Sequence, residues 1–330
     1  MNVRIRTTLC LAVTAVILAM PVSSAVADNI KLSNQLPPSH HISKALDFFA
    51  DKVKEYSGGK TTVKVFHSAQ LFKDTEVVEA LQENLVPIAL VPVNKWSGMI
   101  PATDVFEMPF VFEELDSIKK FIEAGAGELL NEEFKKKGVA DLFWADYGFV
   151  QFFNSKRPLV TPADFEGLKI RTFSNGTAET VSALGGTPVV MSSSEMYMAL
   201  QRKTVDGATT GMPAAVSRKI FEVQNYLTVC NYTTAQFVIQ CNLEWWDELG
   251  KDEKEMLQKA GAEAEAWLRG QIAQSEKDAQ KVIADAGLEI TVLNADQRKA
   301  FVEATEPVRS GFMEKTPLCK KLVEIALGSN

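Results

Sequence analysis

The chain has 330 residues, of which 46% are hydrophobic and 23% are charged, and its formal net charge at pH 7 is −7. This composition is typical of a globular protein that is long enough for two domains with separate cores. The negative charge argues against nucleic acid and anionic lipid as partners, because both would repel the chain.

The first 27 residues are predicted to be a signal peptide. Arg4 and Arg6 precede an apolar run from position 9 to 20, and Ala25-Val26-Ala27 fits the small-x-small cleavage rule. This run is too short to span about 30 Å of hydrocarbon, so a membrane anchor is the weaker interpretation. We therefore expect cleavage after Ala27 and a mature protein in the periplasm.

Three cysteines remain after this cleavage, namely Cys230, Cys241 and Cys319. Three cysteines in a chain of this length do not indicate a disulfide scaffold. Export would permit one bridge, for which Cys230 and Cys241 are the nearest pair, and buried free thiols are the alternative that we favour.

The next segment, up to position 93, predicts a β-α-β-α-β unit. Apolar residues recur at helical spacing from Ile42 to Val53, and Gly58-Gly59 ends that helix. We expect strands at 29–33, 61–66 and 88–93, and helices at 41–56 and 74–85. An irregular aromatic segment at 101–112 and a helical tract at 115–137 follow.

A second β-α-β-α-β unit is predicted between residues 162 and 213. Its strands are expected at 168–171, 188–191 and 204–208, and its helices at 178–184 and 195–202. Residues 140–153 are interpreted as a pair of strands that crosses into this unit, and residues 226–243 as strands that cross back. A long helical tract at 245–286 is expected to break or kink near Gly250, Gly261 and Gly270. A strand at 288–293 and peripheral helices at 296–327 end the chain.

These elements predict an α/β fold with two lobes, each a mostly parallel sheet flanked by helices. Two such lobes around a cleft follow the plan of hinge-closing binding proteins. We expect the first lobe to contain residues 28–150 and about 238–280, and the second lobe residues 151–237 and about 281–330. In such sheets, ligands bind outside the carboxyl ends of the strands.

Arg171 stands at one of these strand ends and has two interpretations. It could form a surface ion pair with Asp164 or Glu166, which is the commoner role of such a residue. It could also hold a ligand carboxylate, because its planar fork of donors matches two carboxylate oxygens. The local sequence alone favours the surface ion pair.

The sequence offers little to support a metal site or catalysis. His40 and His41 are adjacent, so they diverge on a helix, and no cysteine or carboxylate stands at ligand spacing from them. There is no nucleophile elbow, P-loop or dinucleotide fingerprint. We therefore expect neither metal nor cofactor, and no enzyme.

The segment from 162 to 213 also carries motifs that resemble a known family. They are Asp164-x-x-Gly167-Leu168-Lys169-Ile170-Arg171, Leu184-Gly185-Gly186-Thr187-Pro188-Val189, Ser194-Glu195-Met196-Tyr197-x-Ala199-Leu200-Gln201 and Val205-Asp206-Gly207. In order and spacing they resemble the DctP-type substrate-binding proteins of tripartite ATP-independent periplasmic (TRAP) transporters. The likeness continues outside this segment, for example in Ala69-Gln70-Leu71, Met108-Pro109-Phe110 and Trp245-Trp246-Asp247.

The resemblance implies a periplasmic receptor that delivers a small organic anion to a TRAP membrane permease. It also implies a long helix that lies across both lobes. In this family the arginine at the position of Arg171 binds the ligand carboxylate, so the resemblance favours that role over the surface ion pair. By the same likeness the ligand contacts come from several loops, including 38–41, 94–96, 192–193 and 235–237. The residues named for these contacts are Arg171, Gln151, Asn94, Trp96, His40, Gln70, Phe173, Thr210 and Phe237.

Two departures from the family pattern bear on the ligand. Many members have a second arginine shortly after the position of Gly148, where this chain has Phe149-Val150-Gln151, and a Gln-Glu-Asn run where it has Ala208-Thr209-Thr210. We therefore expect a monocarboxylate with a small or partly apolar remainder, or a sulfonate, bound by a monomer. A secreted two-lobed enzyme and a periplasmic sensory protein are the alternatives.

Overall fold

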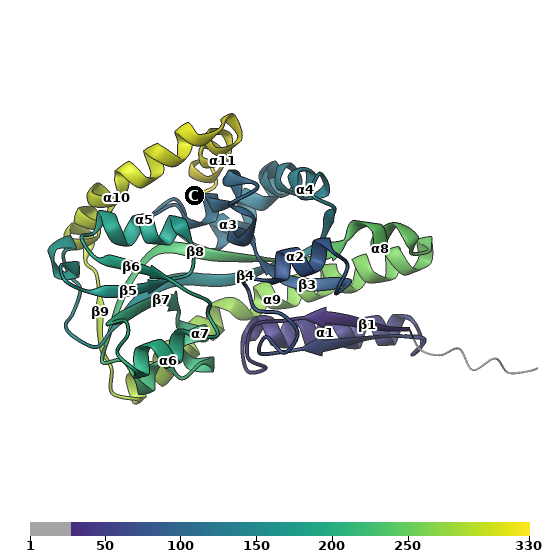
Figure 1. The fold of residues 1–330 in the computed structure, drawn as a ribbon, viewed down its shortest axis with the longest axis horizontal. Helices are drawn as coiled ribbons and strands as arrows, with labels where there is room; N and C mark the ends of the chain where they lie inside the picture. The colour runs from purple at the N-terminus through teal and green to yellow at the C-terminus, as the bar shows by residue number, and fades with distance from the viewer. Residues whose placement is uncertain (1–27) are drawn as a thin grey trace, which may run out of the picture.

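The computed structural model describes residues 28–330, and residues 1–27 appear only as a thin trace in Figure 1. The expected signal peptide and its cleavage after Ala27 lie outside the described residues. Cys230, Cys241 and Cys319 are buried free thiols, so no bridge joins the pair that export would have permitted.

One mixed sheet runs through the described chain, in the order β2-β1-β3-β8-β4-β7-β5-β6, and β9 pairs with β8. Its two ends are parallel groups of three strands, and its centre is a pair of long antiparallel strands. The strands are β1 (Asp28–Ser33), β2 (Thr61–Phe66), β3 (Ile88–Pro92), β4 (Val139–Asn154), β5 (Lys169–Thr172), β6 (Thr187–Val190), β7 (Gly207–Gly211), β8 (Tyr226–Asn242) and β9 (Glu289–Val292).

The two central strands, β4 and β8, join two lobes. The first lobe is built on β1, β2 and β3, and β3 pairs with residues 237–241 of β8. The second lobe is built on β5, β6 and β7, and β7 pairs with residues 150–154 of β4. The confirmed two-lobed α/β fold therefore has its junction in the middle of both long strands.

The strand pair expected over 140–153 is a single strand, and so is the set expected over 226–243. The β4–β8 register shifts between Asp146 and Phe149, where Gly148 adopts a φ of 104°. A β-bulge bends a strand without ending it, and a positive φ costs glycine little. The bend therefore lies inside one continuous strand, where a pair of strands was expected.

Helices cover both faces of the sheet (Figure 1). The α-helices are α1 (His41–Tyr56), α2 (Val77–Gln82), α3 (Leu115–Phe121), α4 (Gly127–Lys135), α5 (Asn175–Ala183), α6 (Met196–Gln201), α7 (Met212–Ser217), α8 (Leu243–Glu248), α9 (Lys251–Asp285), α10 (Ala295–Lys315) and α11 (Pro317–Leu327). Short helical turns are η1 (Val93–Trp96), η2 (Pro101–Glu107), η3 (Ile122–Ala126), η4 (Pro162–Phe165) and η5 (Ile220–Glu222).

Helix α9 spans both lobes, since it packs against α1 and β4 at one end and α7 at the other. Of the three glycines expected to interrupt it, only Gly250 does so, as the residue before its first turn. Gly261 lies inside the helix, where a Cβ atom would stand 2.8 Å from the Phe143 ring. That glycine therefore permits close packing of the helix on β4 rather than a kink.

The C-terminal helices depart from the expected lobe boundaries. Helix α10 packs against α5 of the second lobe, whereas α11 packs against η2 and α3, which follow the first-lobe strands. Leu322 of α11 shares an apolar cluster with Phe106 and Phe121. Burial of this apolar face brings α11 to the first-lobe side, whereas 281–330 as a whole was expected in the second lobe.

Candidate functional site

A small cavity lies between the two lobes, close to the middle of the sheet. Its volume is about 20 Å³, room for about one water molecule. The lining residues come from both lobes and from the strands that join them. They are Gln35, Asp74, Pro92, Asn94, Lys95, Tyr147, Arg171, Phe173, Ser193, Thr210, Ala235 and Phe237.

Arg171, in β5, is the most deeply buried cation of this cavity, with an exposed fraction of 1%. Its Nη1 donates to the Thr209 carbonyl at 3.1 Å, and its Nη2 donates to the Met191 carbonyl at 3.0 Å and to Ser193 Oγ at 2.9 Å. These partners are neutral, so they fix the guanidinium, and the carboxylate that acts on it from a distance, Asp74, is paired with Lys95. Burial lowers the pKa of Arg171 to about 10, which leaves it charged at neutral pH.

The surface ion pair considered for Arg171 is wrong. The Asp164 carboxylate instead accepts hydrogen bonds from Thr161 N at 2.7 Å and from Thr161 Oγ1 at 2.9 Å. The Glu166 carbonyl accepts from Arg157 Nη2 at 2.6 Å. Both residues therefore belong to the turn before β5, on the outside of the lobe.

The first-lobe wall carries a second cation, Lys95, together with a carboxylate, Asp74. Lys95 Nζ lies 3.2 Å from Asp74 Oδ2 and donates to the Phe173 carbonyl of the second lobe at 3.0 Å. Asp74 also accepts a hydrogen bond from Ser192 across the lobes. Burial would raise the pKa of Asp74, but Lys95, Ser192 and Arg171 outweigh it, so that pKa lies below its usual value. Asp74 is therefore ionised.

Asn94, beside Lys95, is held by a buried carboxyl group. Its Nδ2 donates to Glu107, which also accepts from Ser174 Oγ of the second lobe. Burial and the neighbouring Asp104 raise the pKa of Glu107 to about 8. Asn94 Oδ1 has no hydrogen-bond partner within residues 28–330, so it is an acceptor available to a ligand hydroxyl.

Aromatic rings form the remaining wall. The Tyr147 and Phe237 rings stack with centroids 5.3 Å apart, and the Arg171 guanidinium lies 5.7 Å from the Phe173 ring centroid. The Tyr147 hydroxyl lies 3.0 Å from Thr210 Oγ1. The cavity thus combines one cation without a directly paired carboxylate, an ion pair and an aromatic surface.

Five of the nine residues expected at the ligand line this cavity: Asn94, Arg171, Phe173, Thr210 and Phe237. Three others lie elsewhere. Gln151 Oε1 accepts from the backbone of Cys230 and Asn231, so its amide stabilises β8. Trp96 is buried in the first-lobe core and donates to Gln240 Oε1 at 2.9 Å. Gln70 is an exposed residue of the turn after β2.

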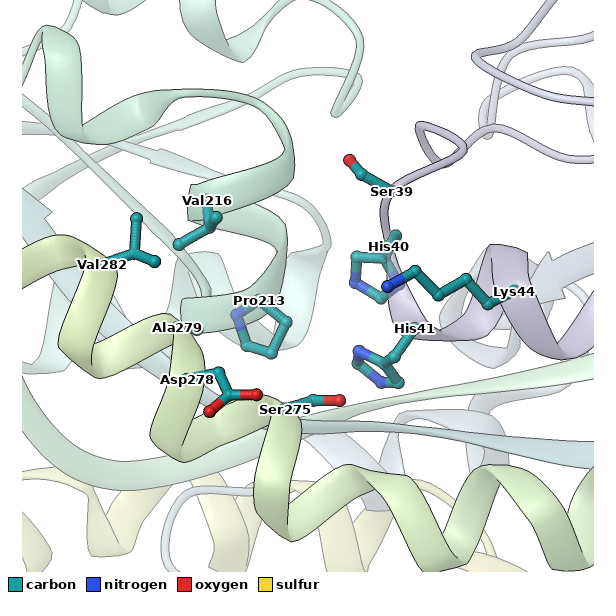
Figure 2. A pocket seen from close by; sticks show the side chains of 10 residues that line it. All are labelled: Ser39, His40, His41, Lys44, Pro213, Val216, Ser275, Asp278, Ala279 and Val282. Atoms are coloured by element: carbon teal, nitrogen blue, oxygen red, sulfur yellow. The ribbon is translucent and has the colours of Figure 1, made fainter.

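His40, the ninth, lies behind the cavity rather than in it. It lines a separate pocket of about 160 Å³ between α1, α7 and α9, with Ser39, His41, Lys44, Pro213, Val216, Ser275, Asp278, Ala279 and Val282 (Figure 2). Its ring stacks on Tyr147 with centroids 5.4 Å apart, so Tyr147 separates the two spaces.

Sequence reasoning missed Gln35, Asp74 and Tyr147, and it named Lys95 only as part of a loop. Asp74 was placed at the start of a helix and Tyr147 inside a crossing strand, which explained both residues without a ligand. Asp74 and Lys95 are separated in the chain by α2 and β3, so no local signal pointed to their ion pair.

Two parallel half-sheets, a pair of connecting strands and a cavity between them define a two-lobed solute-binding protein. Residues 32–316 match the model of the bacterial extracellular solute-binding protein family 7, DctP. The chain belongs to this family. Its members are the periplasmic solute receptors of TRAP transporters, as the sequence motifs predicted.

Individual relatives agree with this assignment. The chain is 32% identical to the C4-dicarboxylate-binding periplasmic protein DctP of Rhodobacter capsulatus, over 94% of this chain and 92% of the relative. A TRAP solute-binding protein from Sulfurospirillum deleyianum with bound succinate has a TM-score of 0.87 and 29% identity, over 92% and 99% of the two chains. One from Bordetella bronchispeptica, with density assigned to pantoate, has a TM-score of 0.86 and 27% identity, over 92% and 99%.

Within the described residues, no helix combines the length and the apolar character that crossing a membrane requires.

Proposed function

We propose that the protein is a periplasmic receptor that binds a small monocarboxylate in the interlobe cavity and delivers it to a TRAP permease. The observation that carries the proposal is the environment of Arg171. Among the described residues its guanidinium contacts only carbonyls, a hydroxyl and a thioether. A buried cation without a directly paired carboxylate is costly, and a ligand carboxylate would supply that partner.

The charge balance of the cavity supports a single negative charge on the ligand. The charged lining groups are Arg171 and Lys95, each +1, and Asp74, −1, which sum to +1. Lys95 is already paired with Asp74. A monocarboxylate or a sulfonate would neutralise the remainder, whereas a dianion would leave a buried excess of negative charge.

The position after Gly148 supports the same conclusion. Phe149-Val150-Gln151 stands where many family members have a second arginine, and Val150 is fully buried in an apolar cluster. No cation from this stretch therefore lines the cavity to hold the second end of a dicarboxylate. This reasoning favours an acid such as pantoate over the succinate bound by the Sulfurospirillum relative.

The size of the cavity requires the lobes to move. A volume of about 20 Å³ is too small for an acid of several carbon atoms, so we propose that the lobes separate for entry and close on the ligand. Ligand binding then favours the closed state by the difference between the ligand's affinities for the two states.

The relatives are binding proteins of transporters, and we propose that this chain likewise binds its ligand without turnover. We also propose that it acts as a monomer and is exported by cleavage after Ala27.

Native mass spectrometry of protein isolated from the periplasm tests the proposal, because a tightly bound solute stays with the protein. We expect a co-purified molecule with one acidic group, bound one per chain and recovered unchanged, and an N-terminus at or near Asp28. A dicarboxylate, a neutral solute or a chemically altered product would contradict the monocarboxylate receptor. Calorimetry with pantoate, lactate, succinate and D-glucuronate then ranks the ligand classes.

A further inference from the structure

His40 and His41 form a stacked pair, with ring centroids 4.3 Å apart, directly behind the aromatic wall of the interlobe cavity. His40 stacks on Tyr147, and Tyr147 stacks on Phe237. Tyr147 also reaches Thr210 of the second lobe through its hydroxyl. This histidine pair therefore supports, from the first lobe, the ring that connects the two lobes at the cavity.

The hydrogen bonds of the pair determine which nitrogen of each ring carries a proton. His40 Nδ1 accepts the Ile42 backbone N–H at 3.2 Å and so caps helix α1. His41 Nε2 lies 3.1 Å from the Asp146 carbonyl oxygen, which can only accept, so this nitrogen donates. Both neutral rings must therefore carry their proton on Nε2.

A second proton on either ring has nowhere favourable to go. On His40 it would sit on Nδ1, against the Ile42 N–H, and the helix cap would be lost. On His41 it would also sit on Nδ1, which has no hydrogen-bond partner among the described residues. The two residues have exposed fractions of 1% and 5%, so little of either ring meets water in the adjoining pocket.

The cations around the pair act in the same direction. Lys44 on α1 and Arg218 after α7 are cations near His40, and Tyr147 is a neutral phenol at this depth. Asp278 on α9 is the one carboxylate across the pocket (Figure 2), and it accepts a hydrogen bond from Gln274. Burial, then the neighbouring cations, lower the pKa of His40 well below its usual value, and burial lowers the pKa of His41 to about 4.

We propose that His40 and His41 are positioning residues for ligand binding, which hold Tyr147 in place only while both rings are neutral, so that acid releases the bound anion. The inference rests on the proposed function, because Tyr147 lines the cavity assigned to the anion. The pocket walls come from α1 in the first lobe and from Pro213 and Val216 in the second. Separation of the lobes would therefore admit water to the pair.

The sign of the pH dependence follows from the difference between the histidine pKa values in the open and the closed form. The rings take up protons near the usual value of 6.5 when water reaches them, and only near 4 for His41 in the closed form. The contribution of the pair to affinity is therefore constant above about pH 7, and affinity falls as the pH drops below 6.5. One such histidine weakens binding by about 30-fold between pH 8 and pH 5, and two by up to about 1,000-fold.

The experiment measures the dissociation constant of pantoate between pH 8 and pH 5 for four proteins. The wild type should lose at least about 30-fold. His40→Asn keeps a helix cap but neither stacks nor titrates, so it should bind about 2–10-fold more weakly at pH 8 and show a shallower decline. His40→Phe restores the stacking and should recover most of the pH 8 affinity with the same shallow decline. His67→Gln, at the only other histidine of the chain, should reproduce the wild-type profile.

Two outcomes separate the inference from the proposed function. Pantoate that binds equally well at pH 8 and pH 5, or an unchanged decline in both His40 variants, would overturn the role of the pair. Absence of pantoate binding at pH 8 would count against the proposed ligand class instead. Nitrogen-15 NMR of the imidazoles at pH 7 needs no ligand: two Nε2–H tautomers support the pair, and an Nδ1–H tautomer or a protonated ring overturns it.

Discussion

The two walls of the interlobe cavity hold their charge differently. On the second-lobe wall, Arg171 is fixed by neutral groups and has no carboxylate paired with it. On the first-lobe wall, Lys95 is paired with Asp74, and both reach across to the second lobe, at the Phe173 carbonyl and Ser192. The comparison suggests a division of labour in which the second lobe binds the anion and the first lobe supplies contacts that close over it.

Removal of Arg171 should have the largest effect. Arg171→Ala would leave the anion buried without its counter-ion, at a cost of about 3–5 kcal/mol by analogy with broken buried pairs. We expect affinity for the tightest monocarboxylate to fall about 100-fold to several thousand-fold in calorimetry. Arg171→Lys, which keeps the charge but loses the fork, should be impaired to a lesser degree. A loss of less than about threefold for the alanine variant would mean that the second lobe does not hold the charge.

Trp96→Phe separates folding from binding on the first-lobe side. The change removes the donor to Gln240 Oε1, which is fully buried. An unpaired buried acceptor costs about 1–3 kcal/mol, so the free energy of unfolding in urea should fall by that amount. Affinity should stay within about twofold, because Trp96 does not line the cavity. If affinity falls tenfold while stability is kept, Trp96 belongs to the ligand site.

Asp74→Asn tests the charge balance itself. It raises the charge of the lining groups from +1 to +2, so dianions should gain relative to monoanions. We expect the ratio of succinate affinity to succinamate affinity to rise about tenfold, about 1.4 kcal/mol. Lys95→Gln is the matched control and should move the ratio the other way. Equal ratios in all three proteins would show that the first-lobe pair does not face the ligand.

The ion pair between Lys73 and Glu195 should have the smallest effect. Its atoms lie 2.9 Å apart across the lobes, with side chains 44% and 52% exposed. Exposed pairs contribute little and are screened by salt. Lys73→Gln should therefore weaken binding by less than about threefold at low ionic strength, and the difference should vanish in about 0.5 M salt. A larger effect that persists at high salt would show that this ion pair stabilises the closed arrangement of the lobes.

Much of the fold could be predicted from local patterns. Helix α1 and strand β2 have the expected ranges, because apolar spacing and Gly58-Gly59 define them within the segment itself. Strand β7 was expected at 204–208 but runs from Gly207 to Gly211, since its position is decided by pairing with residues 150–154 of β4. Gly207 lies so close to that strand that a Cβ atom would stand 2.3 Å from the Phe153 carbonyl oxygen.

The candidate site was predictable where one strand end defines it and not where the lobes meet. Arg171 followed from its position in β5 and from the family motif. Asp74 and Tyr147 gain their roles from partners 118 and 63 residues away, Ser192 and Thr210, which no local pattern relates to them. Trp96 was wrongly expected at the ligand because it stands in a loop that the family resemblance assigns to ligand contacts. Its ring is instead buried in the first-lobe core.

The central claim is that the cavity matches one negative charge, and a matched pair of ligands tests it most directly. Succinate and succinamate have the same chain length, but near pH 8 the first carries two negative charges and the second carries one. Calorimetry on the wild-type protein at that pH, where the histidine pair is neutral, should give at least about tenfold tighter binding of succinamate. Succinate that binds as tightly as succinamate, or more tightly, would contradict the account.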